Sequence, residues 1–216
     1  MKEKALNRIF LITGLLLAVS EIWKQWCLTV VVNKGVYDWW YFPFQLCSLP
    51  MYLLPVFPWV KSRKVRMGLL AFLMDYTLLG GVMVWAEPSG LYYPLTALTL
   101  HSFLWHILLT VIGLTAGWSW RKRADGTGTG KSFLYATSVY GAGCMAAVFL
   151  NGFFQERGEM NMFYINPDAP VTQPVFRQLA PVIGQVPTVI LYGLTVVAGA
   201  GILHSLWGIG RCKKSS

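Results

Sequence analysis

The chain has 216 residues, of which 55% are hydrophobic and only 12% charged, and its mean hydropathy is +0.50. Soluble domains carry about 25% charged residues, so this composition excludes an ordinary soluble protein and is typical of a membrane protein. The net charge of +9 would by itself point to nucleic acid. The basic residues are distributed as membrane topology requires, however, and we expect no nucleic-acid partner.

Six apolar runs predict membrane-spanning helices, because backbone groups in hydrocarbon must form hydrogen bonds within their own segment. The runs cover residues 9–32, 44–60, 67–86, 98–117, 133–154 and 184–210. The first run follows three basic residues but continues to Val32, about the ~20 residues that a bilayer requires. It is therefore interpreted as a span and not as a cleaved signal peptide. The predicted fold is an all-α membrane protein, a single six-helix transmembrane domain over residues 1–216.

The basic residues alternate between the connections of these six runs. Fourteen of the 18 lie at the N-terminus, in the second and fourth loops and at the C-terminus: Lys2, Lys4, Arg8, Lys61, Arg63, Lys64, Arg66, Arg121, Lys122, Arg123, Lys131, Arg211, Lys213 and Lys214. The other connections hold only Lys34, Arg157 and Arg177. By the positive-inside rule, this pattern predicts a multi-pass protein of the cell membrane with both termini in the cytoplasm.

The longest outer connection, residues 155–183, contains four prolines. Loops of this length usually cover something or are disordered. Its Asn161–Tyr164 stretch (NMFY) is too apolar for a free tail, so we expect a lid that packs back onto the bundle.

Six ionisable side chains fall within the predicted spans, where such residues are costly and often functional. They are Glu21, Lys24, Asp75, His101, His106 and His204. Counting from the basic residues places Cys47, His106 and the Glu21–Lys24 pair in one layer, roughly 20–24 Å from the inner edge at 1.5 Å per residue. His101 falls nearer the outer surface, whereas Asp75 and His204 fall in the inner half.

A thiol, an imidazole and a carboxylate in one layer allow nucleophilic chemistry, because a base can convert Cys47 to the attacking thiolate. His106 could accept the proton and Glu21 could orient its ring, with His101 as the alternative base. A helix interrupted at Pro50 would open room beside the thiol. Other interpretations remain open: Cys47 as a small hydrophobe, a Cys27–Cys47 disulfide, and Glu21–Lys24 as a structural ion pair.

The four cysteines, Cys27, Cys47, Cys144 and Cys212, lie scattered among apolar runs. They have neither the paired spacing of a metal site nor that of a disulfide framework. We therefore predict no metal and no cofactor.

Three stretches carry a family resemblance: residues 42–50 (FPFQLCSLP), residues 101–106 (HSFLWH) and the NMFY stretch followed by prolines. Together they resemble the YwaF-like family of bacterial integral membrane proteins, which is similar to a eukaryotic transmembrane acyltransferase that moves acyl chains between phospholipids through a cysteine. The resemblance implies Cys47 as the acyl-accepting nucleophile and His106 as its base, with His101 as the alternative. Membrane lipids are then the substrates, bound by the polar residues Gln45, Glu21, Lys24, Asn151, Gln155, Asn161 and Tyr164.

Two non-enzymatic functions remain as alternatives. In a small transporter, Glu21, Lys24 and Asp75 would line a polar path, although no internal repeat of the kind common in transporters is evident. In a scaffold, small-residue stretches such as residues 141–143 and 199–201 would pack against a partner protein.

Overall fold

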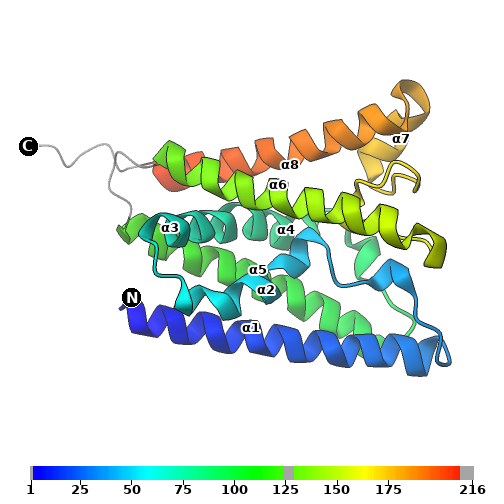
Figure 1. The fold of residues 1–216 in the computed structure, drawn as a ribbon, viewed down its shortest axis with the longest axis horizontal. Coiled ribbons are helices and arrows are strands. Elements are labelled where there is room, and N and C mark those ends of the chain that lie inside the picture. The colour runs from blue at the N-terminus through cyan, green and yellow to red at the C-terminus, as the bar shows by residue number, and fades with distance from the viewer. Residues whose placement is uncertain (1, 124–128, 210–216) are drawn as a thin grey trace, which may run out of the picture.

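A computed structural model describes residues 2–123 and 129–209, and all regular elements in this part of the chain are helical (Figure 1). The α-helices are α1 (Glu3–Trp26), α2 (Leu49–Val56), α3 (Arg63–Phe72), α4 (Leu78–Met83), α5 (Thr96–Arg123), α6 (Thr129–Phe154), α7 (Pro174–Ile183) and α8 (Gln185–Gly208). Two π-helical segments extend them, Cys27–Val32 after α1 and Leu73–Thr77 between α3 and α4. Short 3-10 turns cover Trp39–Tyr41, Leu46–Ser48, Phe57–Trp59, Pro88–Leu91, Gln155–Arg157 and Met162–Tyr164. Cys212 and the basic residues Arg211, Lys213 and Lys214 lie outside the described residues.

Five helical segments are long and apolar enough to cross a membrane: Glu3–Val32, Arg63–Met83, Thr96–Arg123, Gly130–Arg157 and Gln185–Gly208. They correspond to five of the six predicted spans. The sixth, predicted over residues 44–60, is the shorter apolar segment Leu46–Trp59, which consists of α2 between two 3-10 turns. The protein is thus an all-helical polytopic membrane protein, and the second predicted span differs in kind from the other five.

Prolines explain why the second segment is short. Pro50 lies in the first turn of α2, where a missing N–H costs no hydrogen bond, and not in the interior of a longer helix as expected from the sequence. Pro55 lies inside α2, and the α-helix ends one residue later. Gly14 of α1 packs against Pro55, since a Cβ atom added at Gly14 would lie 2.5 Å from Pro55 Cδ. The backbones of α1 and α2 therefore approach closely.

The segment Arg63–Met83 forms the centre of the bundle. Its apolar window is 67% buried, against 33% or less for the other four long segments. It contacts α5, α6 and α8, and Phe72, Met74 and Asp75 on it are fully buried. Side chains at the π-helical turn Leu73–Thr77 thus lie deepest in the protein.

The outward-facing surface of the long helices is apolar. Ile22, Leu104 and Met145 are each exposed over about two thirds of their surface, at 70%, 65% and 70%. Contiguous apolar surface of this kind on several helices is far larger than soluble monomers expose, and is expected for helices that face lipid.

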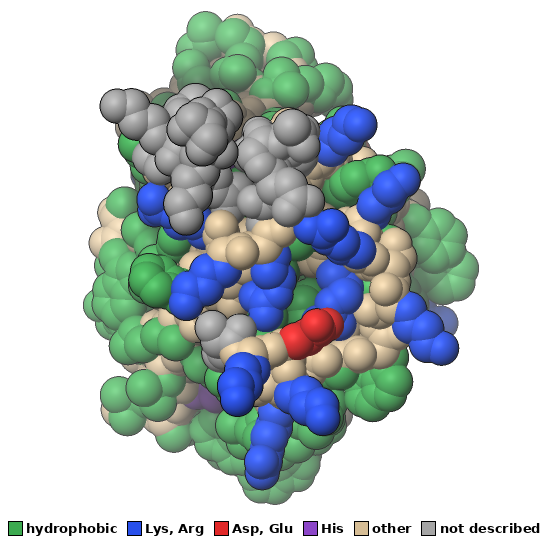
Figure 2. All heavy atoms as spheres, turned by 90° about the vertical axis from the view of Figure 1, so that its left-hand side faces the viewer, with side chains coloured by type: hydrophobic (Ala, Val, Ile, Leu, Met, Phe, Trp, Pro, Cys, Tyr) green, Lys and Arg blue, Asp and Glu red, His purple; other side chains and the backbone are tan. Residues whose placement is uncertain are grey.

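The two ends of the bundle differ in chemistry. At the basic end, where α1 begins, α5 ends and α8 ends, lysine and arginine side chains gather around a small acidic patch (Figures 1 and 2). At the opposite end, here called the loop end, lie the connections 33–45, 84–95 and 155–173, together with α7 (Figure 1). The long loop contains the helix α7, and Pro174 permits it because this proline lies in the first helical turn. From the sequence, residues 155–183 were expected to form a loop throughout.

Candidate functional site

Cys47 lies in the 3-10 turn Leu46–Ser48, immediately before α2. The Trp105 ring of α5 donates a hydrogen bond from Nε1 to the Cys47 carbonyl oxygen at 3.1 Å. This bond joins residues 58 positions apart and fixes the turn against α5. The Ser48 side chain interacts with the Cys47 thiol.

The two histidines predicted as bases both lie beside Trp105 on α5, and each has a different environment. His106 Nδ1 lies 2.8 Å from the Ser102 carbonyl oxygen. Since a carbonyl only accepts, this nitrogen carries the proton and Nε2 is the basic nitrogen of the neutral ring. His101 packs between Trp23 and Trp105 with ring centroids 5.6 Å from each. Both of its buried ring nitrogens lack a hydrogen-bond partner among the described residues.

Glu21 and Lys24 form the ion pair that the sequence analysis gave as one interpretation, with Lys24 Nζ 2.8 Å from Glu21 Oε1. Gln25 donates to the same carboxylate oxygen at 2.7 Å and to the Tyr41 carbonyl at 2.7 Å. Both members of the pair act electrostatically on the Cys47 thiol and on His101. Lys24 also acts electrostatically on His106, so the ion pair links Cys47, His101 and His106. We call these residues, with Trp105, the Cys47 site.

The long loop returns to the bundle and is held there by two amide side chains. Gln45 donates to the Asn161 carbonyl at 2.9 Å and accepts from Phe163 N at 2.7 Å. Asn151 donates to the Met162 carbonyl at 3.2 Å and accepts from Met162 N at 2.7 Å. The expectation that this stretch packs back onto the bundle is confirmed.

The loop is strained at the point where it reaches the Cys47 site. Phe163 and Tyr164 have φ values of 59° and 55°, a left-handed conformation that is uncommon for bulky residues. Such strain persists only where the surroundings over-determine it, as the bonds from Gln45 and Asn151 do here. The Phe163 ring is buried against Phe44 and Tyr140, at centroid distances of 5.6 Å and 6.0 Å.

Tyr164 lies close enough to Cys47 to interact with it electrostatically. Burial, and to a lesser extent Cys47, raises the pKa of Tyr164 to about 12. Its hydroxyl therefore keeps its proton at neutral pH and can act as a hydrogen-bond donor.

The structure uses the remaining predicted substrate-binding residues differently. Gln45 and Asn151 hold the loop, and Asn161 Oδ1 accepts from Asn166 N at 3.0 Å within the loop itself. Gln155 is exposed on the turn Gln155–Arg157. The alternative of a Cys27–Cys47 disulfide is wrong, because both cysteines are free thiols.

A second polar centre lies elsewhere in the bundle. His204 Nδ1 of α8 lies 2.7 Å from Asp75 Oδ2, and the Asp75 side chain is fully buried. The rings of Trp120 and Phe133 pack on the imidazole, with centroids 5.0 Å and 5.2 Å away. The sequence analysis put both residues in the inner half of the bilayer but did not predict that they pair.

Three aromatic residues near Cys47 were missed by the sequence analysis. Trp105 binds the Cys47 carbonyl, while Tyr93 and Tyr192 interact electrostatically with the thiol. The depth count used for the ionisable residues would have found Tyr192, which lies 19 residues before Arg211, close to the 20 residues that separate His101 from Arg121. Only Cys47 and the charged and imidazole side chains were counted, so this signal was lost.

Comparison with known proteins supplies the family. The model of the TMEM164 family matches residues 1–204, nearly the whole chain. Neither a curated protein nor a solved structure matches it. The matched region includes every element of the Cys47 site and the Asp75–His204 pair. On this evidence the chain belongs to the TMEM164 family and is a polytopic membrane protein.

Proposed function

We propose that this protein is a lipid acyltransferase or lipase in which Cys47 is the nucleophile. The observation that carries the proposal is the hydrogen bond from Trp105 Nε1 to the Cys47 carbonyl. It holds the cysteine turn against the stretch of α5 that bears both histidines. The proposal also draws on the resemblance to YwaF-like proteins and to a cysteine-dependent acyltransferase.

In the first step the Cys47 sulfur attacks the carbonyl carbon of a phospholipid ester, after a histidine has taken the thiol proton. The carbon–oxygen bond breaks, the glycerol oxygen takes the proton from the imidazolium, and a thioester remains on Cys47. In the second step a hydroxyl of another lipid, or water, gives its proton to the imidazole and attacks the thioester. The carbon–sulfur bond breaks, and the leaving thiolate takes the proton from the imidazolium, which restores the thiol.

His106 is the better base of the two. Its Nδ1–H is bound to the Ser102 carbonyl, which fixes the ring and leaves Nε2 as the proton acceptor. His101 has both nitrogens free of partners among the described residues, so it is suited to meet a polar atom that a bound lipid brings. Tyr164, which keeps its proton, can donate a hydrogen bond to the lipid's phosphate or ester oxygen.

We further propose that the chain crosses the cell membrane six times, with the basic end in the cytoplasm. Support comes from the clustering of basic side chains at one end of the bundle (Figure 2) and from the positive-inside rule. In this orientation the Cys47 site would face the outer leaflet, and its substrates would be lipids of that leaflet.

Acyl capture tests the proposal directly. Purified protein is incubated with a phospholipid that carries an alkyne-tagged acyl chain, and intact-mass analysis measures the acyl adduct and its release by hydroxylamine, which cleaves thioesters. We expect one adduct on the wild-type protein and none on Cys47→Ala. An adduct and lipid turnover that both survive Cys47→Ala would rule the proposal out.

The chain offers a matched control in Cys144, a second half-buried free cysteine, located on α6. Cys144→Ala should keep the adduct at the wild-type level. His106→Gln should slow adduct formation by about 10²–10⁴-fold, the usual contribution of a general base, while His101→Gln should affect it less. The opposite order would make His101 the base.

The transporter alternative is less well supported by the geometry. Asp75 is paired with His204, and Glu21 is paired with Lys24, so the three residues expected to line one path belong to two separate ion pairs. The scaffold alternative loses part of its basis as well. Gly143 faces Phe163, Gly199 faces Leu79 and Ala200 is buried, all within this chain.

A further inference from the structure

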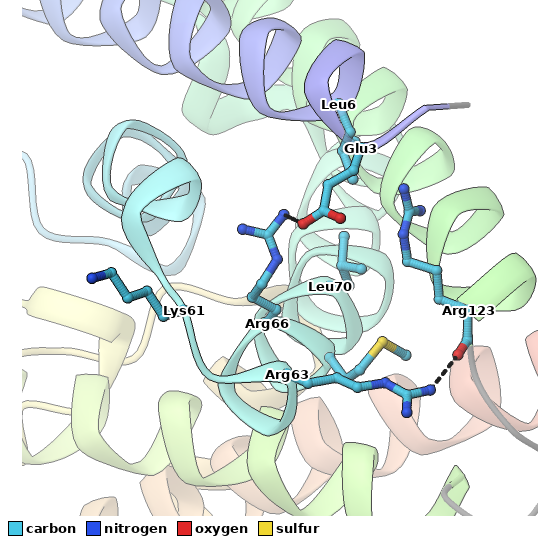
Figure 3. Close-up of a pocket in the computed structure, with 8 residues that line it drawn as sticks. Glu3, Leu6, Lys61, Arg63, Arg66, Leu70 and Arg123 are labelled. Atoms are coloured by element: carbon cyan, nitrogen blue, oxygen red, sulfur yellow. Dashed lines mark hydrogen bonds and ion pairs between the residues drawn. The ribbon is translucent and has the colours of Figure 1, made fainter.

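Charged side chains at the basic end of the bundle bind groups of the same chain. Arg66 pairs with Glu3 at 3.2 Å. Arg63 donates to the Arg123 carbonyl at 3.3 Å (Figure 3). The loop end is different, because part of its surface is apolar and is left uncovered by the described residues. This surface belongs to α7, the helix that joins the long loop to α8 (Figure 1).

The side chains of α7 are divided between an apolar and a polar side. Val175 and Val182 lie seven residues apart, about two helical turns, and therefore project from the same side. They are exposed over 64% and 79% of their surface. Arg177, which is also exposed, lies about 150° around the helix from them. We call the side with the two valines the Val175–Val182 edge.

The rest of the protein holds α7 from another side. Its main contacts are with α8, where the Phe176 ring packs edge-on against Tyr192 with centroids 5.3 Å apart. Arg177 acts electrostatically on Glu87 of the connection 84–95. No residue of α7 is buried. The Val175–Val182 edge therefore has no cover among the described residues.

A helix as short as α7 needs a cover on its apolar side. Isolated helices shorter than about 12–15 residues are marginal in water, and most helices in proteins are stabilised by burial of an apolar face. α7 has only 10 residues, and Pro181 lies inside it, where a proline removes a backbone hydrogen bond. Contact with α8 along one side leaves the two most exposed apolar side chains without any burial. We therefore expect an apolar phase or partner on the Val175–Val182 edge.

The apolar surface continues from α7 onto α8. Ile183 at the end of α7 and Val186 at the start of α8 are 42% and 55% exposed, and Ile190 and Leu194 follow on α8 at 58% and 61%. The segment Gln185–Gly208 is long and apolar enough to cross a membrane, and only 11% of its apolar window is buried within the protein. This surface of α8 is expected to face lipid, so hydrocarbon is the cover that continues onto the Val175–Val182 edge.

The composition of the edge also favours lipid over a protein partner. The residues that dominate protein interfaces are Trp, Tyr and Arg, whereas Val and Leu are under-represented among them. The edge and its continuation on α8 consist of Val, Ile and Leu. The single charged residue of α7, Arg177, lies on another side of the helix.

We propose that α7 is an interfacial helix whose Val175–Val182 edge is inserted among the lipids of the leaflet at the loop end. Helices of this kind lie in the plane of the membrane, with the apolar side about 5–10 Å deep at the boundary between head groups and acyl chains. Arg177 is then directed toward water and head groups. Through Phe176 the inserted helix borders Tyr192, which interacts electrostatically with Cys47, so lipid on this edge lies beside the Cys47 site.

Thiol alkylation of the full-length protein in phosphatidylcholine nanodiscs tests the proposal. A cysteine is introduced on the edge (Val182→Cys), on the polar side (Arg177→Cys) or on the exposed surface of α8 (Leu194→Cys), and a charged, water-soluble maleimide is added. Peptide mass spectrometry follows residues 158–211, a stretch without a native cysteine. We expect Val182→Cys to react at least about tenfold more slowly than Arg177→Cys, because a thiolate surrounded by hydrocarbon is strongly disfavoured.

The variant Leu194→Cys is the reference for a lipid-covered thiol, and Val182→Cys should react at a similar rate. Equal rates for Val182→Cys and Arg177→Cys would place the edge in water and overturn the proposal. If Val182→Cys does not fold, Val175→Cys on the same edge decides by the same comparison.

A photo-crosslinking arm identifies what covers the edge. The variant Val182→benzoylphenylalanine reacts with neighbouring C–H bonds on irradiation, and its intact mass should rise by one phosphatidylcholine molecule. A covalent dimer would show that a second copy of the chain covers the edge, and an unchanged mass would show that water does; either would overturn the proposal. Cys47→Ala should leave these results unchanged, so failure of the acyl-capture experiment does not affect this test, and the reverse also holds.

Discussion

The Cys47 site and the Asp75–His204 pair are both polar centres inside an apolar bundle, but they use their polar groups differently. In the pair, the carboxylate and the imidazole bond to each other at 2.7 Å through Oδ2 and Nδ1, aromatic rings pack on the imidazole, and Asp75 Oδ1 has no hydrogen-bond partner among the described residues. In the Cys47 site, Glu21 and Lys24 are likewise bonded to each other, but the hydrogen bond from Trp105 goes to the backbone of Cys47. Both nitrogens of His101 are without a partner among the described residues.

The bonded imidazole of His204 and the imidazole of His101, which has no partner among the described residues, are expected to differ in what they contribute to stability and to ligand binding. A buried ion pair that is directly bonded costs much to break, since either partner alone is an uncompensated buried charge. A site whose polar side chains are left unpaired costs free energy in the resting protein. That cost is recovered when a ligand supplies the missing partner, so unpaired groups are expected where a substrate binds.

The largest expected effect is at the pair. Asp75→Ala should lower the free energy of unfolding by about 3–5 kcal/mol, because it leaves His204 in an apolar environment without its carboxylate. Thermal unfolding in detergent measures this change. The double variant Asp75→Leu/His204→Leu should be distinctly more stable than Asp75→Ala, and a double variant that is less stable would show that the pair is not the main interaction of these residues.

An intermediate effect is expected where the loop covers the Cys47 site. A Cβ atom on Gly143 would lie 2.9 Å from Phe163 Cζ and 3.3 Å from Leu49 Cδ1, so Gly143→Ala should destabilise the protein by about 1–3 kcal/mol through overpacking. The loop around Phe163 should also exchange its amide hydrogens faster.

Gly141 provides the control two residues away on the same helix. A Cβ atom there would have nothing within 4 Å, so Gly141→Ala should stabilise α6 by up to about 1 kcal/mol through helix propensity. Equal effects at the two glycines would mean that Phe163 does not depend on this close contact.

The smallest expected effect is at His101. His101→Phe keeps the ring contacts with Trp23 and Trp105 and removes two buried nitrogens that have no partner among the described residues. The free energy of unfolding should stay within about 0.5 kcal/mol of wild type, again by thermal unfolding. A loss above about 2 kcal/mol would indicate a hydrogen bond at this ring, and the contrast with Asp75 would then disappear.

The sequence predicted the features that depend on local pattern. Apolar runs located the five long helices, and the spacing of Glu21 and Lys24 on one helix led to the interpretation that they form an ion pair, which the structure contains. Both follow from the regular geometry of a helix.

Features that depend on which helix faces which could not be predicted in the same way. The Asp75–His204 bond joins residues 129 positions apart, and the Trp105–Cys47 bond joins residues 58 apart. Height alone does not give the rotation of a helix about its axis. The roles of Gln45 and Asn151 were missed for a related reason, since polar side chains predicted to bind a ligand are equally able to bind a loop backbone.

The short second segment has a consequence for the surrounding lipid. Its 14 residues, Leu46–Trp59, rise only about 21 Å at helical geometry, whereas the hydrocarbon core is about 30 Å thick. In the six-span topology proposed above, such hydrophobic mismatch would be relieved by local thinning of the bilayer. Cys47, at the tip of this segment, would then lie at the floor of a dimple in the membrane surface, where the ester groups of neighbouring lipids descend to the level of its sulfur.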